Sequence, residues 1–329
     1  MLRIITIAVL ALGVFGGASV DANAQKYNLT MSGASPKGLW SLLGVGSNAA
    51  ISSAFPGSIV TYQTSGGGLA NVPIVSTGRA HLGIAHNIEL VVAAKGTAPF
   101  KGPFKNLRAI AYMYNWAPMQ MIMTKEFANK YGIKSLDDLS KKKPPVRIAV
   151  NQRGNMVQDM NQKILEAYGV SYKDIKSWGG QVVYSPGREQ GQLMSDRRVD
   201  MIGNGVFVPY RYFVQVSKSR DLVIFPLRSD VIQKVAADTG ADPYVIKGGG
   251  YPWQPKEINT VALGAVLFTS DAMKDQDAYN LTKALVENVG KIKAVHKAMR
   301  NLTPKLMASQ TSIPYHAGAL RLYKEKGLK

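Results

Sequence analysis

Three short loops in this sequence combine glycine with small polar residues in a way that suits the binding of an anion. They span residues 33–38, 65–68 and 153–155, and each joins a strand-like stretch to one with helical spacing. The first N–H groups of a helix have no partner within it, and the helix dipole adds positive charge there. Glycine lets a ligand approach that backbone closely. An ordinary turn explains any single loop, but three of them favour a site for a small anion.

Two side chains beside these loops could hold such an anion. Arg153 is expected to bind a carboxylate directly, because a guanidinium donates two parallel hydrogen bonds to it; pairing with a surface acid is the alternative. Trp40 lies in the first turn after Gly38 and is expected to point into the site, although a single tryptophan more often fills a core. The predicted ligand-binding residues are, in full, Ser35, Lys37, Trp40, Ser65, Gly66, Gly67, Asn71, His86, Asn87, Tyr114, Asn115, Arg153, Gly154, Asn155, Met156, Asn204, Phe207 and Tyr251.

Enzyme chemistry has little support in the sequence. There is no cysteine, and the four histidines lack the close spacing of metal ligands, so we predict neither a metal site nor a cofactor. No nucleophile elbow or Walker motif occurs, and Gly66-Gly67-Gly68 does not fit a dinucleotide-binding GxGxxG. His86 is placed near the site, but a lone histidine is more often structural. We therefore expect that the protein is not an enzyme. A periplasmic enzyme built on the fold of a binding protein is the less favoured alternative.

The charge and the N-terminus indicate an exported protein with an anionic partner. Forty Lys and Arg residues against 21 Asp and Glu give a net charge of +19, which indicates anionic partners, with a solvated basic surface as the equally weighted alternative. Residues 1–24 are typical of a cleaved signal peptide: Arg3 provides the positive start, residues 4–14 are apolar, and Ala22-Asn23-Ala24 fits a cleavage site. We expect a periplasmic protein that starts near Gln25 and does not bind nucleic acid.

Strand-like and helical stretches alternate along the chain in two series. In the first series, strands are expected at 27–31, 58–63 and 81–85, with helices at 39–55 and 69–77. In the second series, strands are expected at 146–150, 181–184 and 201–202, with helices at 156–168 and 187–197. Alternation of this kind predicts an α/β fold with mainly parallel sheets covered by helices.

Further apolar stretches lie where the chain would cross between two lobes. They span residues 107–114, 119–124 and 260–269. We therefore expect a discontinuous lobe one, residues 25–122 and 262–329, and a lobe two of residues 123–261. The C-terminal part is expected to be helical, because apolar residues recur near a helical period at Leu281, Leu285, Val289 and Ile292.

Short motifs spread over the mature chain, taken in order, resemble those of one known family. They include Gly38-Leu39-Trp40, Ser65-Gly66-Gly67 with Asn71, the segment 76–83, Gly96-Thr97-Ala98-Pro99-Phe100 and Gly250-Tyr251-Pro252. On these residues the chain resembles the TAXI receptors of tripartite ATP-independent periplasmic (TRAP) transporters. The resemblance implies a type II periplasmic-binding-protein fold, in which two α/β lobes close over a small organic anion in the cleft between them. It also implies delivery to an integral-membrane TRAP permease; a sensory role beside a membrane signalling protein is the alternative.

The chain departs from the family pattern within the expected site. His86-Asn87-Ile88 stands where the family commonly has glutamine, any residue and aspartate. Because an isoleucine offers no counter-charge, a ligand with an ammonium group would be left poorly paired. We therefore expect a carboxylate without an amino group, with an aromatic or aliphatic body against Trp40, Met156 or Phe207.

Overall fold

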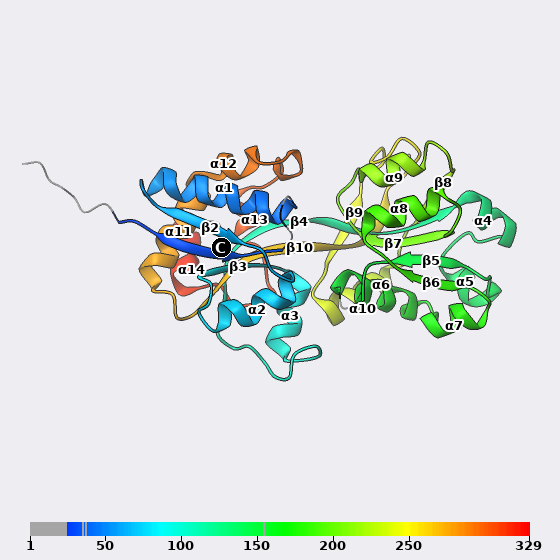
Figure 1. The fold of residues 1–329 in the computed structure, drawn as a ribbon, viewed down its shortest axis with the longest axis horizontal. Coiled ribbons are helices and arrows are strands. Elements are labelled where there is room, and N and C mark those ends of the chain that lie inside the picture. The colour runs from blue at the N-terminus through cyan, green and yellow to red at the C-terminus, as the bar shows by residue number, and fades with distance from the viewer. Residues whose placement is uncertain (1–24, 35, 37, 154) are drawn as a thin grey trace, which may run out of the picture.

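The structure, a computed structural model, describes residues 25–34, 36, 38–153 and 155–329. The expected signal peptide, residues 1–24, and the predicted site residues Ser35, Lys37 and Gly154 lie outside the described residues. The described chain forms two halves that lie side by side, each with a sheet and covering helices (Figure 1). Within it, no helix is both long enough and apolar enough to cross a membrane.

The first half is built on parallel strands that alternate with helices. Strand β1 (Asn28–Ser32) lies between β2 (Ile59–Gln63) and β3 (Leu82–His86), and both pairings are parallel. The helices α1 (Leu39–Ala54) and α2 (Gly68–Ser76) begin where the glycine-containing loops end, as predicted. Helix α3 (Asn87–Lys95), which directly follows β3, was not expected from the sequence. The C-terminal residues add the helical elements α11 (Asp275–Glu287), α12 (Val289–Ala294), η1 (Lys297–Met299), α13 (Pro304–Met307) and α14 (Ala317–Glu325).

The second half repeats this plan around strand β5 (Arg147–Val150). It pairs in parallel with β6 (Gln181–Tyr184) and β7 (Met201–Gly205). Two more strands lie at its margins, β8 (Leu222–Phe225) and β9 (Asp242–Ile246). Its helices are α4 (Lys125–Tyr131), α5 (Asp137–Lys142), α6 (Met156–Ala167), α7 (Tyr172–Ser177), α8 (Gly187–Ser195), α9 (Arg211–Val216) and α10 (Ser229–Thr239).

Two long strands run from one half into the other. Strand β4 (Leu107–Thr124) is one continuous strand, so the expectation of separate strands at 107–114 and 119–124 is wrong. It pairs antiparallel with β10 (Ile258–Ser270), and the two cross between the halves together (Figure 1). Their partners β7, β8, β9 and β3 are also antiparallel to them, so the sheet is mixed and not mainly parallel. The chain enters the second half along β4 and returns to the first half along β10, so these two strands run in opposite directions.

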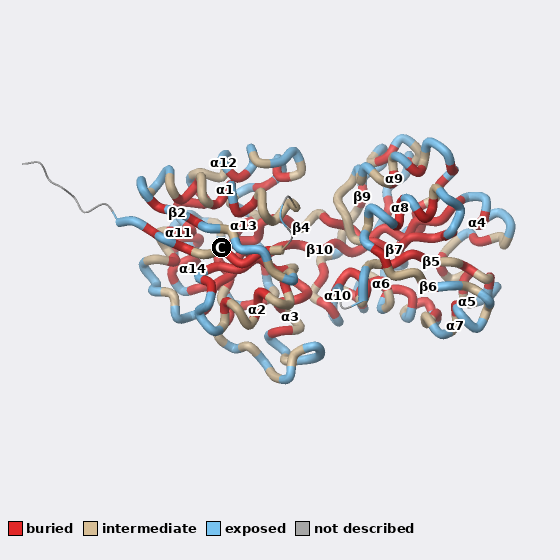
Figure 2. The backbone as a smooth tube through the Cα atoms, viewed as in Figure 1, coloured by how far each residue is buried: buried red, intermediate tan, exposed pale blue. Residues whose placement is uncertain are grey.

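Both crossing strands are buried along most of their length (Figure 2). The seven apolar residues of β10 between positions 261 and 268 are fully buried. This part of β10 therefore belongs to the apolar core. At Gly264 the strands come so close that a side-chain carbon would overlap the hydroxyl of Tyr112. That hydroxyl donates a 2.5 Å hydrogen bond to Asp242 in β9. The join between the halves is therefore tightly packed and held by specific polar contacts.

Candidate functional site

A cleft between the two halves contains two adjoining cavities. The first, of about 330 Å³, is lined mainly by aromatic and apolar side chains, and we call it the aromatic chamber. The second, of about 490 Å³, is lined by the glycine-rich turn at 65–68 and by residues 152, 153 and 155; we call it the polar chamber. Ala34, Trp40 and His86 line both chambers. These volumes are typical of small-molecule sites.

Rings from both halves and from β4 form the aromatic chamber. Trp40, in the first turn of α1, donates a 3.0 Å hydrogen bond from its indole Nε1 to the Tyr114 hydroxyl in β4. The Tyr114 ring lies edge-on to Phe207, with 5.1 Å between the ring centroids. The centroids of the His86 and Trp40 rings lie 5.0 Å apart, and both residues also line the polar chamber. Trp40 therefore points into the cleft, as the sequence suggested.

The Tyr114 hydroxyl is a fixed polar group in otherwise apolar surroundings. Burial raises the pKa of this hydroxyl well above its ordinary value, so it keeps its proton at neutral pH. It accepts from Trp40 and donates to no described residue. A polar atom of a ligand in the aromatic chamber could accept this one hydrogen bond.

The glycine-rich turn of the polar chamber is rigid. The Ser65 hydroxyl donates to the side-chain oxygen of Asn71 over 2.6 Å and accepts from the Gly67 N–H over 3.0 Å. Gly67 has φ of +98°, a conformation that a residue with a side chain rarely adopts. Asn71 itself is fully buried and donates to the carbonyls of Gly33 and Ile84. The predicted residue Asn71 therefore positions the turn and does not line either chamber.

Arg153 reaches the polar chamber from the loop before α6. Its guanidinium stacks on the Tyr184 ring, 3.8 Å from the ring centroid, and forms no ion pair with any described residue. Stacking of this kind uses the face of the guanidinium and leaves its in-plane N–H donors available. Asn155, which follows in the same wall, caps α6 by accepting from the Val157 N–H over 2.9 Å.

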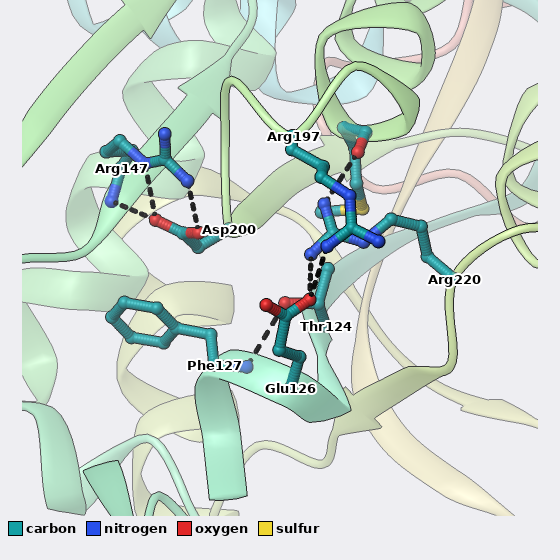
Figure 3. A network of polar contacts seen from close by, with 8 residues as sticks. Thr124, Glu126, Phe127, Arg147, Arg197, Asp200 and Arg220 are labelled. Atoms are coloured by element: carbon teal, nitrogen blue, oxygen red, sulfur yellow. Dashed lines mark hydrogen bonds and ion pairs between the residues drawn. The ribbon is translucent and has the colours of Figure 1, made fainter. Parts of the chain in front are cut away.

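Arginines at the opposite end of the same strands are paired (Figure 3). Arg147, at the start of β5, makes two hydrogen bonds to Asp200, of 2.8 and 2.7 Å. Arg197 and Arg220 both donate to the same carboxylate oxygen of Glu126, over 3.1 and 2.9 Å. These three arginines lie at or before the amino ends of β5, β7 and β8, whereas Arg153 follows the carboxyl end of β5, where ligands bind in open α/β sheets.

Sequence reasoning missed an acid in the polar chamber, Glu89. This third residue of α3 accepts the His86 N–H over 2.8 Å, as the acid of a capping box does, and only 6% of its surface is exposed. It lies directly behind the glycine-rich turn, because a side-chain carbon at Gly68 would overlap its carboxylate. Burial raises the pKa of Glu89, and the nearby His86 partly opposes this shift. The capping-box spacing from His86 was the signal that could have placed it.

The segment His86-Asn87-Ile88, which departs from the TAXI pattern, has one residue in the cleft and two in the interior of the molecule. His86 lines both chambers, and its Nδ1 lies 3.0 Å from the Gly264 carbonyl in β10. Asn87 is buried: it accepts from the Gly264 N–H over 3.0 Å and donates to the Gly240 carbonyl over 2.7 Å. Ile88 is fully buried in the apolar core.

The predicted site residues that the structure describes fall into two groups. Those that line a chamber are Trp40, Ser65, Gly66, Gly67, His86, Tyr114, Arg153, Asn155 and Phe207. Those that line neither chamber are Asn71, Asn87, Asn115, Met156, Asn204 and Tyr251. In the second group, Tyr251 is buried and donates to Gln120 over 2.7 Å, and Asn204 is buried and donates to Gln190 over 3.0 Å. Besides Glu89, the lining residues that were missed include Leu39, Ala117, Gln152, Val206 and Tyr210.

Among the described residues, no cluster of three or more metal-ligating side chains occurs. The residues that converge on the cleft are therefore one stacked arginine, one covered acid, a rigid turn and a set of aromatic rings. This set can bind and orient an organic molecule by hydrogen bonds and apolar contact.

Solved structures with this architecture come from several proteins of low sequence identity. MatC from Rhodopseudomonas palustris, solved with bound malate, has a TM-score of 0.53 at 11% identity and covers 92% of this chain and 97% of its own. A protein from Bordetella bronchiseptica RB50 has a TM-score of 0.51 at 15% identity, over 92% and 98% of the two chains. A periplasmic transporter has a TM-score of 0.50 at 16% identity, over 93% and 95%.

These similarities establish the periplasmic-binding-protein fold, with two α/β halves around a cleft, in agreement with the fold expected from the sequence. The model of one protein family matches residues 31–327, which is most of this chain. The chain belongs to the NMT1-like family.

Proposed function

We propose that this protein is a periplasmic solute receptor that captures a small organic acid through its carboxylate and delivers it to a TRAP-type membrane permease. The observation that carries the proposal is that Arg153 lines the polar chamber without a described acid paired to it. Among the described residues, it is the single Lys or Arg that lines either chamber, and no described acid pairs with it. A guanidinium held in this way, with free in-plane donors, suits a carboxylate.

The two halves act in this proposal as lobes that close on the ligand. Lobe one comprises residues 25–122 and 262–329, and lobe two residues 123–261. Each chamber takes its lining from both halves, so a small ligand contacts all of it only when the halves approach one another. Strands β4 and β10 join the halves and are the natural place for the hinge (Figure 1).

Export and delivery rest on the sequence motifs. Residues 1–24 have the pattern of a signal peptide, which would take the mature chain to the periplasm. The resemblance to TAXI receptors supports a TRAP permease as the membrane partner. Among the solved structures with this fold, MatC carries malate, an organic acid, and another is a periplasmic transporter.

A thermal-shift screen of organic acids on the mature chain tests the proposal. Mass spectrometry of molecules that co-purify supplements the set, and a true ligand raises the melting temperature with its concentration. We expect Arg153→Ala to reduce this shift strongly, and Arg188→Ala, at an exposed position of α8 outside both chambers, to leave it unchanged. Equal stabilisation of the Arg153→Ala variant and the parent would contradict the role of Arg153.

A further inference from the structure

We infer that the ligand is a monocarboxylic acid with an aromatic ring and no amino group, whose carboxylate binds Arg153 while its ring enters the aromatic chamber. The inference rests on the proposed function and specifies its ligand class. It follows from the different lining of the two chambers and from the charges that face the polar one.

The aromatic chamber is suited to a flat apolar body. Its described lining contains no Lys, Arg, Asp or Glu side chain. The polar atoms of Trp40 and Tyr114 already bond to one another, and the edge-on rings of Tyr114 and Phe207 form its wall. Aromatic rings pack in such arrangements through offset and edge-to-face contacts. A second carboxylate placed here would meet no Lys or Arg among the described lining residues and could accept one hydrogen bond, from the Tyr114 hydroxyl, which compensates poorly for burying a charge.

The two chambers meet at Trp40 and His86, and a ligand can therefore span both. Both residues, with Ala34, line the aromatic chamber and the polar chamber. Arg153 lies in the polar chamber, so a ring held beside Trp40 would direct its carboxylate toward that arginine. A ligand with one carboxylate attached to an aromatic ring would therefore match a cleft that has a basic group in one chamber and apolar rings in the other.

The charges of the polar chamber disfavour a second carboxylate there as well. In its described lining, Arg153 is the single Lys or Arg side chain, and Glu89, behind the glycine-rich turn, is the single acid. A dicarboxylate would therefore bring two negative charges to one cation, and its second carboxylate would approach either Glu89 or the uncharged aromatic chamber. Like charges at short range raise the free energy of the complex.

Glu89 is also poorly placed to pair with a ligand ammonium group. It is almost wholly covered, and its Oε2 already accepts the His86 N–H. The backbone of Gly68 lies against the carboxylate on the side of the turn. The covered Glu89 carboxylate therefore offers little room for a ligand ammonium group to pair with it. The sequence also predicted a ligand without an amino group, but for another reason, the apolar Ile88.

Calorimetric titration of the mature chain tests the ligand class with defined probes. These are benzoate and phenylacetate as aryl monocarboxylates, succinate and malate as dicarboxylates, and phenylalanine as the aryl acid with an amino group. We expect at least one aryl monocarboxylate to bind about tenfold or more tightly than every other probe. Phe207→Leu should weaken that aryl acid about fivefold or more. Trp40→Leu serves as a second variant, and Phe104→Leu, which packs on Phe100 outside both chambers, is the matched control.

A further variant tests the part played by charge. Glu89→Gln keeps the shape of the side chain and removes its charge, so we expect the affinity for succinate to rise while that for the aryl acid stays within about threefold. Tighter binding of succinate, malate or phenylalanine than of both aryl acids by the parent would overturn the inference and leave the receptor proposal intact. If no carboxylate binds and Arg153→Ala changes nothing in the wider screen, the proposed function fails with it.

Discussion

The side-chain amide of Asn87, at the start of α3, donates a 2.7 Å hydrogen bond to the carbonyl of Gly240, at the end of α10. The same side chain accepts from the Gly264 N–H in β10. One buried asparagine thus links the first half, the second half and a crossing strand. A residue that the sequence placed among the ligand contacts lies at the join between the halves.

Replacement of Asn87 by alanine should destabilise the protein. It leaves the buried N–H of Gly264 and the carbonyl of Gly240 without partners, which typically costs about 1–3 kcal/mol. Urea unfolding of the mature chain measures the change in the free energy of unfolding. Asn129→Ala, at an exposed position in α4, is the control and should change it by less than about 0.5 kcal/mol. A loss of the same small size for Asn87→Ala would show that these bonds contribute little.

Gly68→Ala should destabilise the protein because the new methyl group would overlap the Glu89 carboxylate. Overpacking of this kind typically costs about 1–3 kcal/mol. The double variant Gly68→Ala with Glu89→Ala should recover part of that loss, since the overlap is removed. The control is Gly102→Ala, where a side-chain carbon meets no atom within 4 Å and φ is not positive. Equal effects at both glycines would exclude a close contact between residues 68 and 89.

The stability of the protein should depend on pH through Glu89. Burial raises the pKa of Glu89 in the folded state above that in the unfolded chain. Below the unfolded pKa, the group is protonated in both states and costs nothing. As pH rises between the two pKa values, the unfolded chain releases its proton first, so stability falls until the folded pKa is passed.

Glu89→Gln removes this titration, so it isolates the contribution of one group. The free energy of unfolding of the parent minus that of the variant should fall as pH rises from about 4 toward neutrality. Urea unfolding at several pH values measures the difference, in which other titrating groups largely cancel. A difference that stays constant with pH would mean that Glu89 has an ordinary pKa.

Ligand binding should bring the two halves together. Each chamber takes its lining from both halves, and a small acid can contact both walls fully only after closure. Small-angle X-ray scattering should therefore show a smaller radius of gyration when the mature chain is saturated with the acid that gives the largest thermal shift. The Arg153→Ala variant, titrated over the same acid concentrations, should need a higher concentration than the parent to reach the smaller radius. An unchanged radius in the saturated parent would argue against a hinge.

The sequence predicted the frame of the site well because local signals were clear. Glycine and polar residues mark the ends of strands, and the helices that follow begin at Leu39, Gly68 and Met156, at or next to the expected positions. The division of β4 into two strands was wrong because Asn115 and Pro118 interrupt the apolar pattern, although the backbone continues through them. Pairing with β10 along this region holds the strand together.

The direction of individual polar side chains could not be predicted in the same way. Asn71, Asn87 and Tyr251 are of residue types that suit a ligand site, but buried backbone groups need partners too, and these side chains supply them. Glu89 lies at a capping-box position, which usually indicates an exposed helix end. Its place behind the turn depends on the close approach of Gly68, a contact 21 residues away along the chain that no local pattern encodes.

The affinity ratio of two arginine variants tests the central claim most directly. The acid with the largest thermal shift is titrated calorimetrically into the parent, Arg153→Ala and Arg188→Ala. The loss of a charge-assisted partner should weaken binding to Arg153→Ala at least about tenfold, while Arg188→Ala stays within about twofold of the parent. If Arg153→Ala binds that acid as tightly as the parent does, Arg153 does not hold the carboxylate and the cleft is not the acid site described here.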